Sequence, residues 1–154
     1  MSACDILVIA NLNMDLILEQ KNSQQTSRKR YADSFTLSPG GNGYNEAVAA
    51  ARMGATVALA GMIGSDSFGA QLKASLNEEI TDSQLVRVVP GSSGLSLILS
   101  SAGQENIYWD IVGANACLDE EYIRGLESHI AKVKLLCVRE RMMIDSSSFS
   151  PFFT

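Results

Sequence analysis

A chain of 154 residues with 46% hydrophobic residues can bury one sizeable core, so its composition indicates a single globular domain. The net charge of −5, with acidic and basic residues interspersed, disfavours nucleic acid or an anionic membrane as a partner. No apolar run approaches the length of a membrane span, and no secretion signal is expected at the N-terminus. The three scattered cysteines disfavour a disulfide framework or a metal site, so we expect a cytoplasmic protein.

The first part of the chain alternates predicted strands and helices. Residues 5–10 form a continuous apolar run, which is typical of a strand buried on both faces of a parallel sheet. Residues 16–19 and 31–37 flank a polar loop and are predicted to form a peripheral antiparallel pair. A helix is predicted over residues 45–53, where alanines permit close packing on a sheet and Gly54 provides the C-cap.

The middle of the chain continues this alternation. Residues 56–60 form a second apolar run, and Asp66 is placed to cap the helix that follows. Further strands are predicted at residues 85–89 and 95–99, and a turn after the latter leads into a half-exposed strand at residues 107–112. The last two strands are expected to form a hairpin.

Towards the C-terminus the acidic residues 119–121 open another predicted helix, and residues 133–138 follow as a strand. The apolar residues on the buried face of that helix are Tyr122, Ile123, Leu126 and Ile130. Residues 141–154 form a serine-rich tail without helical or strand periodicity, so they are expected to be irregular. Strands that alternate with helices predict an α/β layered fold with a parallel central sheet.

Two polar clusters stand where an α/β sheet binds its ligands. Asn13 and Asp15 follow the first buried strand, and a carboxylate beside an amide can bind a vicinal diol. The segment from Gly40 to Asn45 places glycines and amides before a helix, where backbone N–H groups can approach an oxygen-rich ligand closely. Alternatively, the polar pair caps a loop and the glycines form an ordinary turn. Neither a dinucleotide-binding glycine motif nor a P-loop is present.

Three segments together resemble a known family. They are Asn11-Leu12-Asn13-Met14-Asp15, Ser38-Pro39-Gly40-Gly41-Asn42-Gly43-Tyr44-Asn45 and Gly61-Met62-Ile63-Gly64-Ser65-Asp66-Ser67-Phe68-Gly69. Their order resembles the first half of ribokinase-like (PfkB-type) carbohydrate kinases. The resemblance is specific over residues 5–72 and continues more weakly through residues 113–116 to about Glu140.

The resemblance implies a three-layer ribokinase-like sandwich in residues 1–140, with a small β lid built from about residues 16–37 and 95–112. It also implies a sugar pocket, lined by Asn13, Asp15, Gly40, Gly41, Asn42, Gly43, Asn45 and Glu140. Asn42 departs from the family, which usually has lysine at this position, so the substrate stays open.

The implied reaction moves the γ-phosphate of ATP, bound with Mg, onto a sugar hydroxymethyl group. The family's nucleotide site and catalytic aspartate lie in a motif Asp-Thr-x-Gly-Ala-Gly-Asp, which these 154 residues do not contain. We therefore assign no catalytic residue and expect this chain by itself to be inactive. The alternative is a catalytically inactive fragment or isoform that serves as a sugar-binding or dimerisation module.

The lid is also the segment through which this family often dimerises, so a homodimer through the lid is a second implication. Tyr108 and Trp109 in the predicted hairpin either close over the sugar, face a partner lid, or fill the underside of the hairpin. An uncovered edge of the central sheet predicts marginal stability and self-association.

Overall fold

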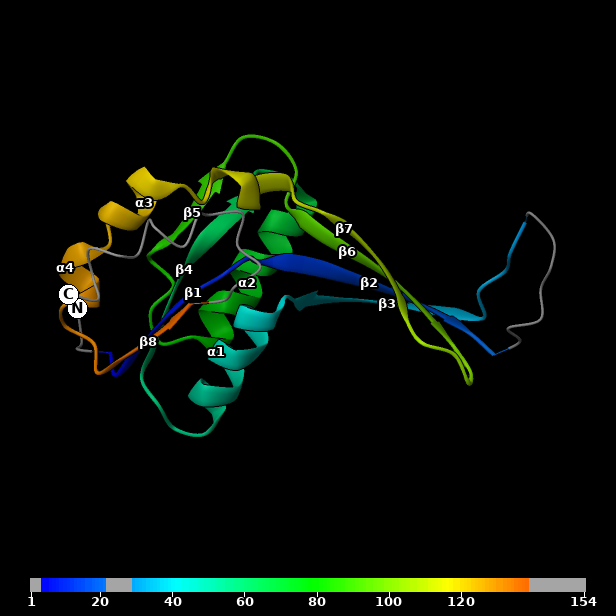
Figure 1. The fold of residues 1–154 in the computed structure, drawn as a ribbon, viewed down its shortest axis with the longest axis horizontal. Coiled ribbons are helices and arrows are strands. Elements are labelled where there is room, and N and C mark those ends of the chain that lie inside the picture. The colour runs from blue at the N-terminus through cyan, green and yellow to red at the C-terminus, as the bar shows by residue number, and fades with distance from the viewer. Residues whose placement is uncertain (1–3, 22–28, 139–154) are drawn as a thin grey trace.

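The protein is built around a parallel sheet and a second, mixed sheet. The computed structural model describes residues 4–21 and 29–138 (Figure 1). The parallel sheet has the order β5-β4-β1-β8 and consists of β1 (Ile6–Ile9), β4 (Val57–Gly64), β5 (Val86–Val89) and β8 (Leu135–Val138). The second sheet has the order β3-β2-β6-β7 and consists of β2 (Asn13–Gln20), β3 (Ser34–Gly40), β6 (Gly94–Ser101) and β7 (Ile107–Ile111).

Helices cover both faces of the parallel sheet. On one face lie α1 (Asn42–Arg52) and α2 (Ser67–Glu79), and on the other lie η1 (Gly113–Cys117), α3 (Glu120–Arg124) and α4 (Glu127–Ile130). Residues of β1 alternate between the two cores: Val8 packs with α1 and α2, whereas Leu7 and Ile9 pack with α3. The continuous apolar run of β1 is therefore explained by burial on both faces, and the predicted three-layer α/β fold is confirmed.

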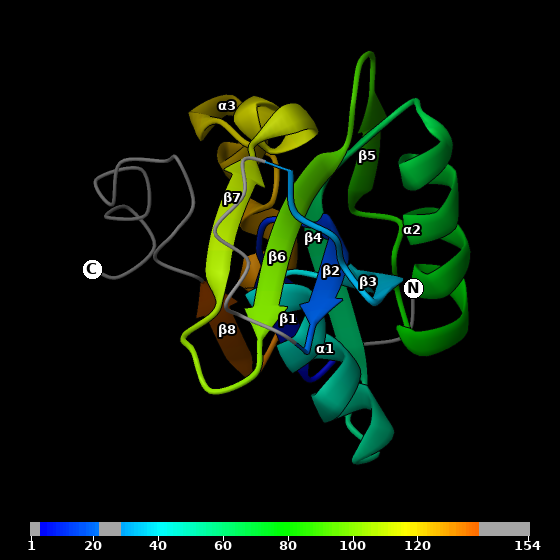
Figure 2. The same cartoon turned by 90° about the vertical axis from the view of Figure 1, so that its right-hand side faces the viewer.

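The second sheet extends away from these layers as a long ribbon, which we call the lid sheet (Figures 1 and 2). β2 pairs antiparallel with β3 and parallel with β6, and β6 pairs antiparallel with β7. The predicted peripheral pair and the predicted hairpin are both present, and the β2–β6 pairing joins them into one sheet. β2 and β6 are longer than predicted, because they pair with each other along their whole length, whereas β3 starts and ends three residues later than predicted.

Three other predicted boundaries were wrong for reasons that the structure shows. α1 begins at Asn42 rather than residue 45, because Gly41 has a φ of 96° and turns the chain directly into the helix. β4 continues through Gly64, since its second half leaves β1 and pairs with β5 instead. The helix predicted after residue 119 is two short helices, and the break falls at Gly125, a poor residue for a helix interior.

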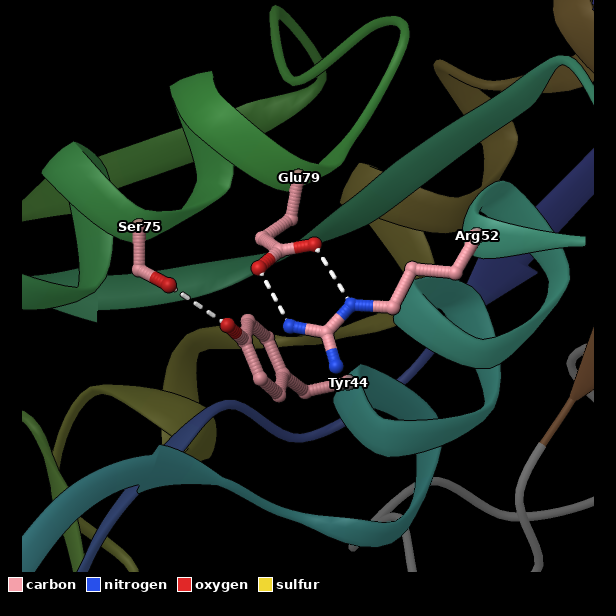
Figure 3. A network of polar contacts seen from close by, with 4 residues as sticks. All are labelled: Tyr44, Arg52, Ser75 and Glu79. Atoms are coloured by element: carbon pink, nitrogen blue, oxygen red, sulfur yellow. Dashed lines mark hydrogen bonds and ion pairs between the residues drawn. The ribbon is translucent and has the colours of Figure 1, made fainter. Parts of the chain in front are cut away.

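Side-chain contacts join α1 to α2 (Figure 3). The hydroxyls of Tyr44 and Ser75 lie 2.6 Å apart, and Tyr44 is 6% exposed. Two turns further along α1, the guanidinium of Arg52 donates two hydrogen bonds to the carboxylate of Glu79, at 3.0 and 2.5 Å. Solvent reaches this ion pair and weakens it, whereas the tyrosine contact is shielded from water.

In the segment from Gly61 to Gly69, the side chain of Asp66 joins α2 to the start of β6. Asp66 caps α2 by accepting a hydrogen bond from the N–H of Gly69 at 2.8 Å, as predicted. The same carboxylate accepts bonds from the N–H and hydroxyl of Ser93, at 3.0 and 2.7 Å. Burial opposes the ionisation of Asp66, but these hydrogen bonds outweigh it and lower its pKa. Asp66 thus fixes the start of α2 against the residue that precedes β6.

Close helix–sheet contact at Gly43 provides a stability test. A Cβ on Gly43 would lie 2.0 Å from the Cβ of Ala10, so Gly43→Ala must separate α1 from β1. We expect the free energy of unfolding to fall by about 2 kcal/mol or more, as for other overpacked cores. Urea unfolding measures this change.

Gly54→Ala is the matched control. Gly54 has a φ of 95° and open space around a Cβ position, so its substitution tests backbone strain without crowding. A cost of about 1 kcal/mol is expected there. Equal losses in the two variants would contradict the crowding argument.

Candidate functional site

Strand register brings together polar residues and glycines that are distant in sequence. Asn13, the first residue of β2, pairs with Gly40 on β3 and with Gly94 on β6. Two residues later Asp15 pairs with Ser38 and Ser96. Asn13 and Asp15 therefore point to the same face of the lid sheet, directly beyond the carboxyl end of β1. The next strand was predicted to start at residue 16. In the structure Asn13 and Asp15 already belong to β2, because β3 and β6 pair with them on both sides.

The carboxylate of Asp15 occupies space that only glycine leaves open. A Cβ on Gly40 would lie 2.0 Å from Oδ2 of Asp15. The backbone N–H of the next residue, Gly41, donates a hydrogen bond to this carboxylate. A Cβ on Gly41 would in turn approach the carbonyl oxygen of Asn11 to 2.8 Å. The two glycines therefore let the backbone of residues 40–41 approach the Asp15 carboxylate closely.

The ionisation of Asp15 is disfavoured in the folded protein. Burial raises the pKa of the carboxyl group, the Gly41 hydrogen bond partly offsets this, and the negative charge of Asp110 raises it further. Asp110 on β7 lies in the same cross-strand row, since Asp15 pairs with Ser96 and Ser96 pairs with Asp110. The hydroxyl of Ser96 donates a 2.6 Å hydrogen bond to Asp110. One face of the lid sheet thus carries two carboxylates on either side of a buried serine.

Asn13 is bound to a buried amide from a distant segment. The side chain of Asn115 in η1 is 2% exposed, and its Nδ2 donates a 2.8 Å hydrogen bond to Oδ1 of Asn13. Asn115 also accepts a bond from the N–H of Leu12 and donates one to its carbonyl oxygen, at 2.9 and 3.3 Å. A Cβ on Gly94 would lie 2.2 Å from both side chains, so glycine is required there.

The first turn of α1 adjoins Asp15 through Gly41. The N–H of Gly41 donates to the Asp15 carboxylate, and its carbonyl oxygen accepts from the N–H of Asn45 at 3.0 Å. Asn42 and Asn45 are three residues apart and both exposed, so they lie on one side of the helix start. Gly41 has no side chain to cap the helix, so the first N–H groups of α1 lack a side-chain cap.

Two of the predicted site residues are not placed at the site by these contacts. Gly43 is buried against Ala10, so packing of α1 on β1 is sufficient to explain its glycine. Glu140 lies outside the residues that the structure describes. Asn13, Asp15, Gly40 and Gly41 are brought together at the start of the lid sheet, with Asn42 and Asn45 adjacent to them.

The register separates the two aromatic residues of the hairpin. Tyr108 pairs with Ile98, which pairs with Ile17, so it lies on the same face as Asp15. Trp109 pairs with Leu97 and lies on the opposite face. Their exposed fractions are 57% and 54%, so neither side chain fills the underside of the hairpin.

Two other kinds of site find no support in residues 4–21 and 29–138. No group of three or more His, Cys, Asp or Glu side chains in these ranges could hold a metal ion. Within the same ranges, no helix is long and apolar enough to cross a membrane.

The fold is a parallel α/β sandwich with a lid sheet, and the carboxylate, amides and glycines meet where the two sheets join. The chain matches the pfkB family carbohydrate kinase profile over residues 4–149 and belongs to that family. The ribokinase of Haemophilus influenzae is 30% identical over 135 residues, which are 87% of this chain and 44% of the relative. The chain thus spans about half the length of the curated relatives it matches.

Solved structures show the same fold. The ribokinase of Giardia lamblia superposes with a TM-score of 0.82 at 24% identity, covering 98% of this chain and 45% of that one. The ribokinase of Arabidopsis thaliana, complexed with ribose and ATP, superposes with a TM-score of 0.74 at 19% identity. That match covers 94% of this chain and 47% of the Arabidopsis chain.

Sequence reasoning missed Asn115, Gly94, Ser96 and Asp110. Gly94, Ser96 and Asp110 reach the site through pairing of β6 with β2 and β7, and a parallel pairing between distant strands has no local sequence signal. Asn115 reaches it from η1 through hydrogen bonds to Leu12 and Asn13. Asn115 carried one signal, because the segment Gly113-Ala114-Asn115-Ala116 continued the family resemblance. An amide within a small-residue segment is a reasonable candidate for a buried hydrogen-bonding residue.

The raised pKa of Asp15 predicts how stability depends on pH. Because the folded protein disfavours the charged form, the stability linked to this group is greatest below its ordinary pKa of 3.8 and falls as pH rises through the raised value. Asp15→Asn removes this loss and keeps an acceptor for Gly41. The variant is therefore expected to gain stability relative to wild type with rising pH, by less than about 1 kcal/mol because the carboxylate is only half-buried.

Urea unfolding of both proteins from pH 3.5 to 7 measures the difference. Asp110→Asn is the control, because removing the neighbouring charge should shift the transition of Asp15 to lower pH. A stability difference that is constant over the whole pH range would contradict the assignment.

Proposed function

We propose that this chain forms the sugar-binding part of an ATP-dependent, ribokinase-like carbohydrate kinase. The observation that carries the proposal is the Asp15 carboxylate, which lies against Gly40 and accepts the N–H of Gly41 just before α1. A half-buried carboxylate with amides beside it suits a ligand rich in hydroxyl groups, because each hydroxyl both donates and accepts.

The proposed pocket consists of Asn13, Asp15, Gly40, Gly41, Asn42, Gly43, Asn45 and Glu140. In it, Asp15 accepts hydrogen bonds from sugar hydroxyls, and the exposed amides of Asn42 and Asn45 bind further oxygens. Gly40 and Gly41 let the ligand approach the backbone, while Gly43 keeps α1 close to β1. The unit is proposed to cover residues 1–140, with the lid over residues 16–37 and 95–112.

A pentose is the proposed substrate. The names of the relatives support this choice, since they include ribokinases and the deoxyribokinase of Salmonella typhi. The bound ribose and ATP of the Arabidopsis ribokinase support the same pair of substrates for the longer protein.

Phosphoryl transfer is proposed for the family's full length and not for these 154 residues alone. ATP would supply the phosphoryl group and Mg would neutralise its charge, and the described residues contain no carboxylate cluster that fits the metal. The contribution of this chain is to bind and orient the sugar hydroxyls and to exclude water beneath the lid. We propose a cytoplasmic setting, which agrees with the three free cysteines.

The lid sheet is proposed to form a homodimer contact through its apolar face. By register, the face opposite Asp15 carries Leu16, Leu18, Phe35, Leu37, Leu97, Leu99, Ile107, Trp109 and Ile111. Phe35 is 69% exposed and Ile111 is 54% exposed, which is unusual for large apolar side chains on one face of a sheet. A second copy of the same face would bury these side chains by an isologous contact.

Sugar binding and turnover are tested on the purified chain. Calorimetry with D-ribose and 2-deoxy-D-ribose is expected to show binding that Asp15→Ala weakens at least about tenfold, because a charge-assisted hydrogen bond contributes roughly 1.5–3 kcal/mol. A coupled assay of ATP consumption with the same sugars is expected to show no turnover.

An extended product that contains the Asp-Thr-x-Gly-Ala-Gly-Asp motif is the positive control for turnover. Binding without turnover supports the proposal, and turnover by the 154 residues alone contradicts it. Absence of any sugar binding in both products would refute the sugar site itself.

The lid contact is tested with two neighbouring substitutions of equal charge. Trp109→Glu places a carboxylate on the apolar face and is expected to weaken dimerisation at least about tenfold, as loss of an interface tryptophan does. Tyr108→Glu is the matched control, because Tyr108 is equally exposed on the opposite face. Sedimentation equilibrium measures both, and equal weakening in the two variants would argue against the assigned face.

A further inference from the structure

The amide of Asn115 has only one orientation that its partners permit. Its Oδ1 accepts from the N–H of Leu12, which can only donate, and its Nδ2 donates to the carbonyl oxygen of Leu12, which can only accept. Since both partners are backbone groups of fixed polarity, the oxygen and nitrogen of Asn115 cannot be exchanged.

This orientation determines the orientation of Asn13. The atom of Asn115 that faces Asn13 is Nδ2, a donor, so the atom of Asn13 that receives it at 2.8 Å must be Oδ1. The NH2 group of Asn13 is then the part of its side chain left for a ligand. Burial of Asn115 at 2% exposure keeps water from competing for these bonds.

We propose that Asn115 is a positioning residue for the sugar site, which holds Asn13 so that its NH2 group, and not its carbonyl oxygen, faces the ligand. The proposal rests on the proposed function and deepens it. Asn13 acts as a fixed donor two residues from Asp15, a fixed acceptor, on the same face of β2. A pair of sugar hydroxyls satisfies both groups, whereas a ligand with an ammonium group at the Asn13 position is rejected.

Gly94 supports the same assignment. A Cβ at this position would lie 2.2 Å from Nδ2 of Asn115 and 2.2 Å from Oδ1 of Asn13, the two atoms of the bond in question. The register of β2 with β6 therefore places a glycine, which has no side chain, against this hydrogen bond.

The first test is made on the protein without a ligand. NMR of the Asn13 side-chain amide is expected to show an ordered group in wild type and an averaged one in Asn115→Asp, which keeps the acceptor for Leu12 but cannot donate to Asn13. In wild type a scalar coupling is also expected across the bond from Nδ2 of Asn115 to the side-chain carbonyl of Asn13. An averaged Asn13 amide in wild type without this coupling overturns the proposal, even if the variant fails to fold.

The second test measures D-ribose affinity in a double-mutant cycle. Asn13→Ala and Asn115→Asp are each expected to weaken binding about tenfold, and the double variant also about tenfold, because both remove the same contact. A hundredfold loss in the double variant, or unchanged affinity in Asn115→Asp, overturns the proposal.

Tyr122→Phe separates positioning from general destabilisation. It removes the hydrogen bond from the buried Tyr122 in α3 to the carbonyl oxygen of Leu85, which lies on the same face of the central sheet as η1 but involves neither Asn13 nor Asn115. This variant is expected to unfold at lower temperature and to bind ribose within about twofold of wild type. If wild type binds no ribose, the proposed function fails, and the NMR result still decides the role of Asn115.

Discussion

The half-buried carboxylate of Asp15 imposes the main constraint on the structure around it. A charge taken partly out of water needs hydrogen bonds and room, and here Gly41 supplies an N–H group while Gly40 supplies the room. The bend that brings both glycines to Asp15 also sets where α1 starts, and the start of α1 sets where Gly43 meets Ala10. The ligand site and the helix–sheet contact are therefore parts of one arrangement.

Glycine has two separate uses in this molecule. At Gly41 it allows a backbone angle that other residues rarely adopt, whereas at Gly40, Gly43 and Gly94 it leaves space for a neighbouring side chain. A sequence does not distinguish these uses, because both appear as the same letter. The structure distinguishes them by the atom that an added Cβ would meet. At Gly40 that atom belongs to the Asp15 carboxylate, and at Gly43 it is the Cβ of Ala10 in the packed core.

Local sequence signals predicted the elements well and their partners poorly. The buried run of β1 and the cap at Asp66 depend on residues next to each other in the chain, so they were readable. The placement of Asp110 depends on β6 pairing in parallel with β2, a contact between segments about 80 residues apart that has no local sequence signal. Asn115 reaches Asn13 from a still more distant segment through a side-chain hydrogen bond. The start of α1 was missed because a glycine before a helix predicts a turn equally well.

The lid sheet has two unlike faces because its strands alternate. Along β2, Asp15 and Ile17 belong to one face while Leu16 and Leu18 belong to the other. Slipping β2 by a single residue against its neighbours would exchange the faces, exposing the carboxylate where apolar side chains now lie. The pairing of β2 with β3 and β6 therefore maintains both the polar face and the apolar face of the lid sheet. A one-residue insertion in β2 would disrupt both faces together.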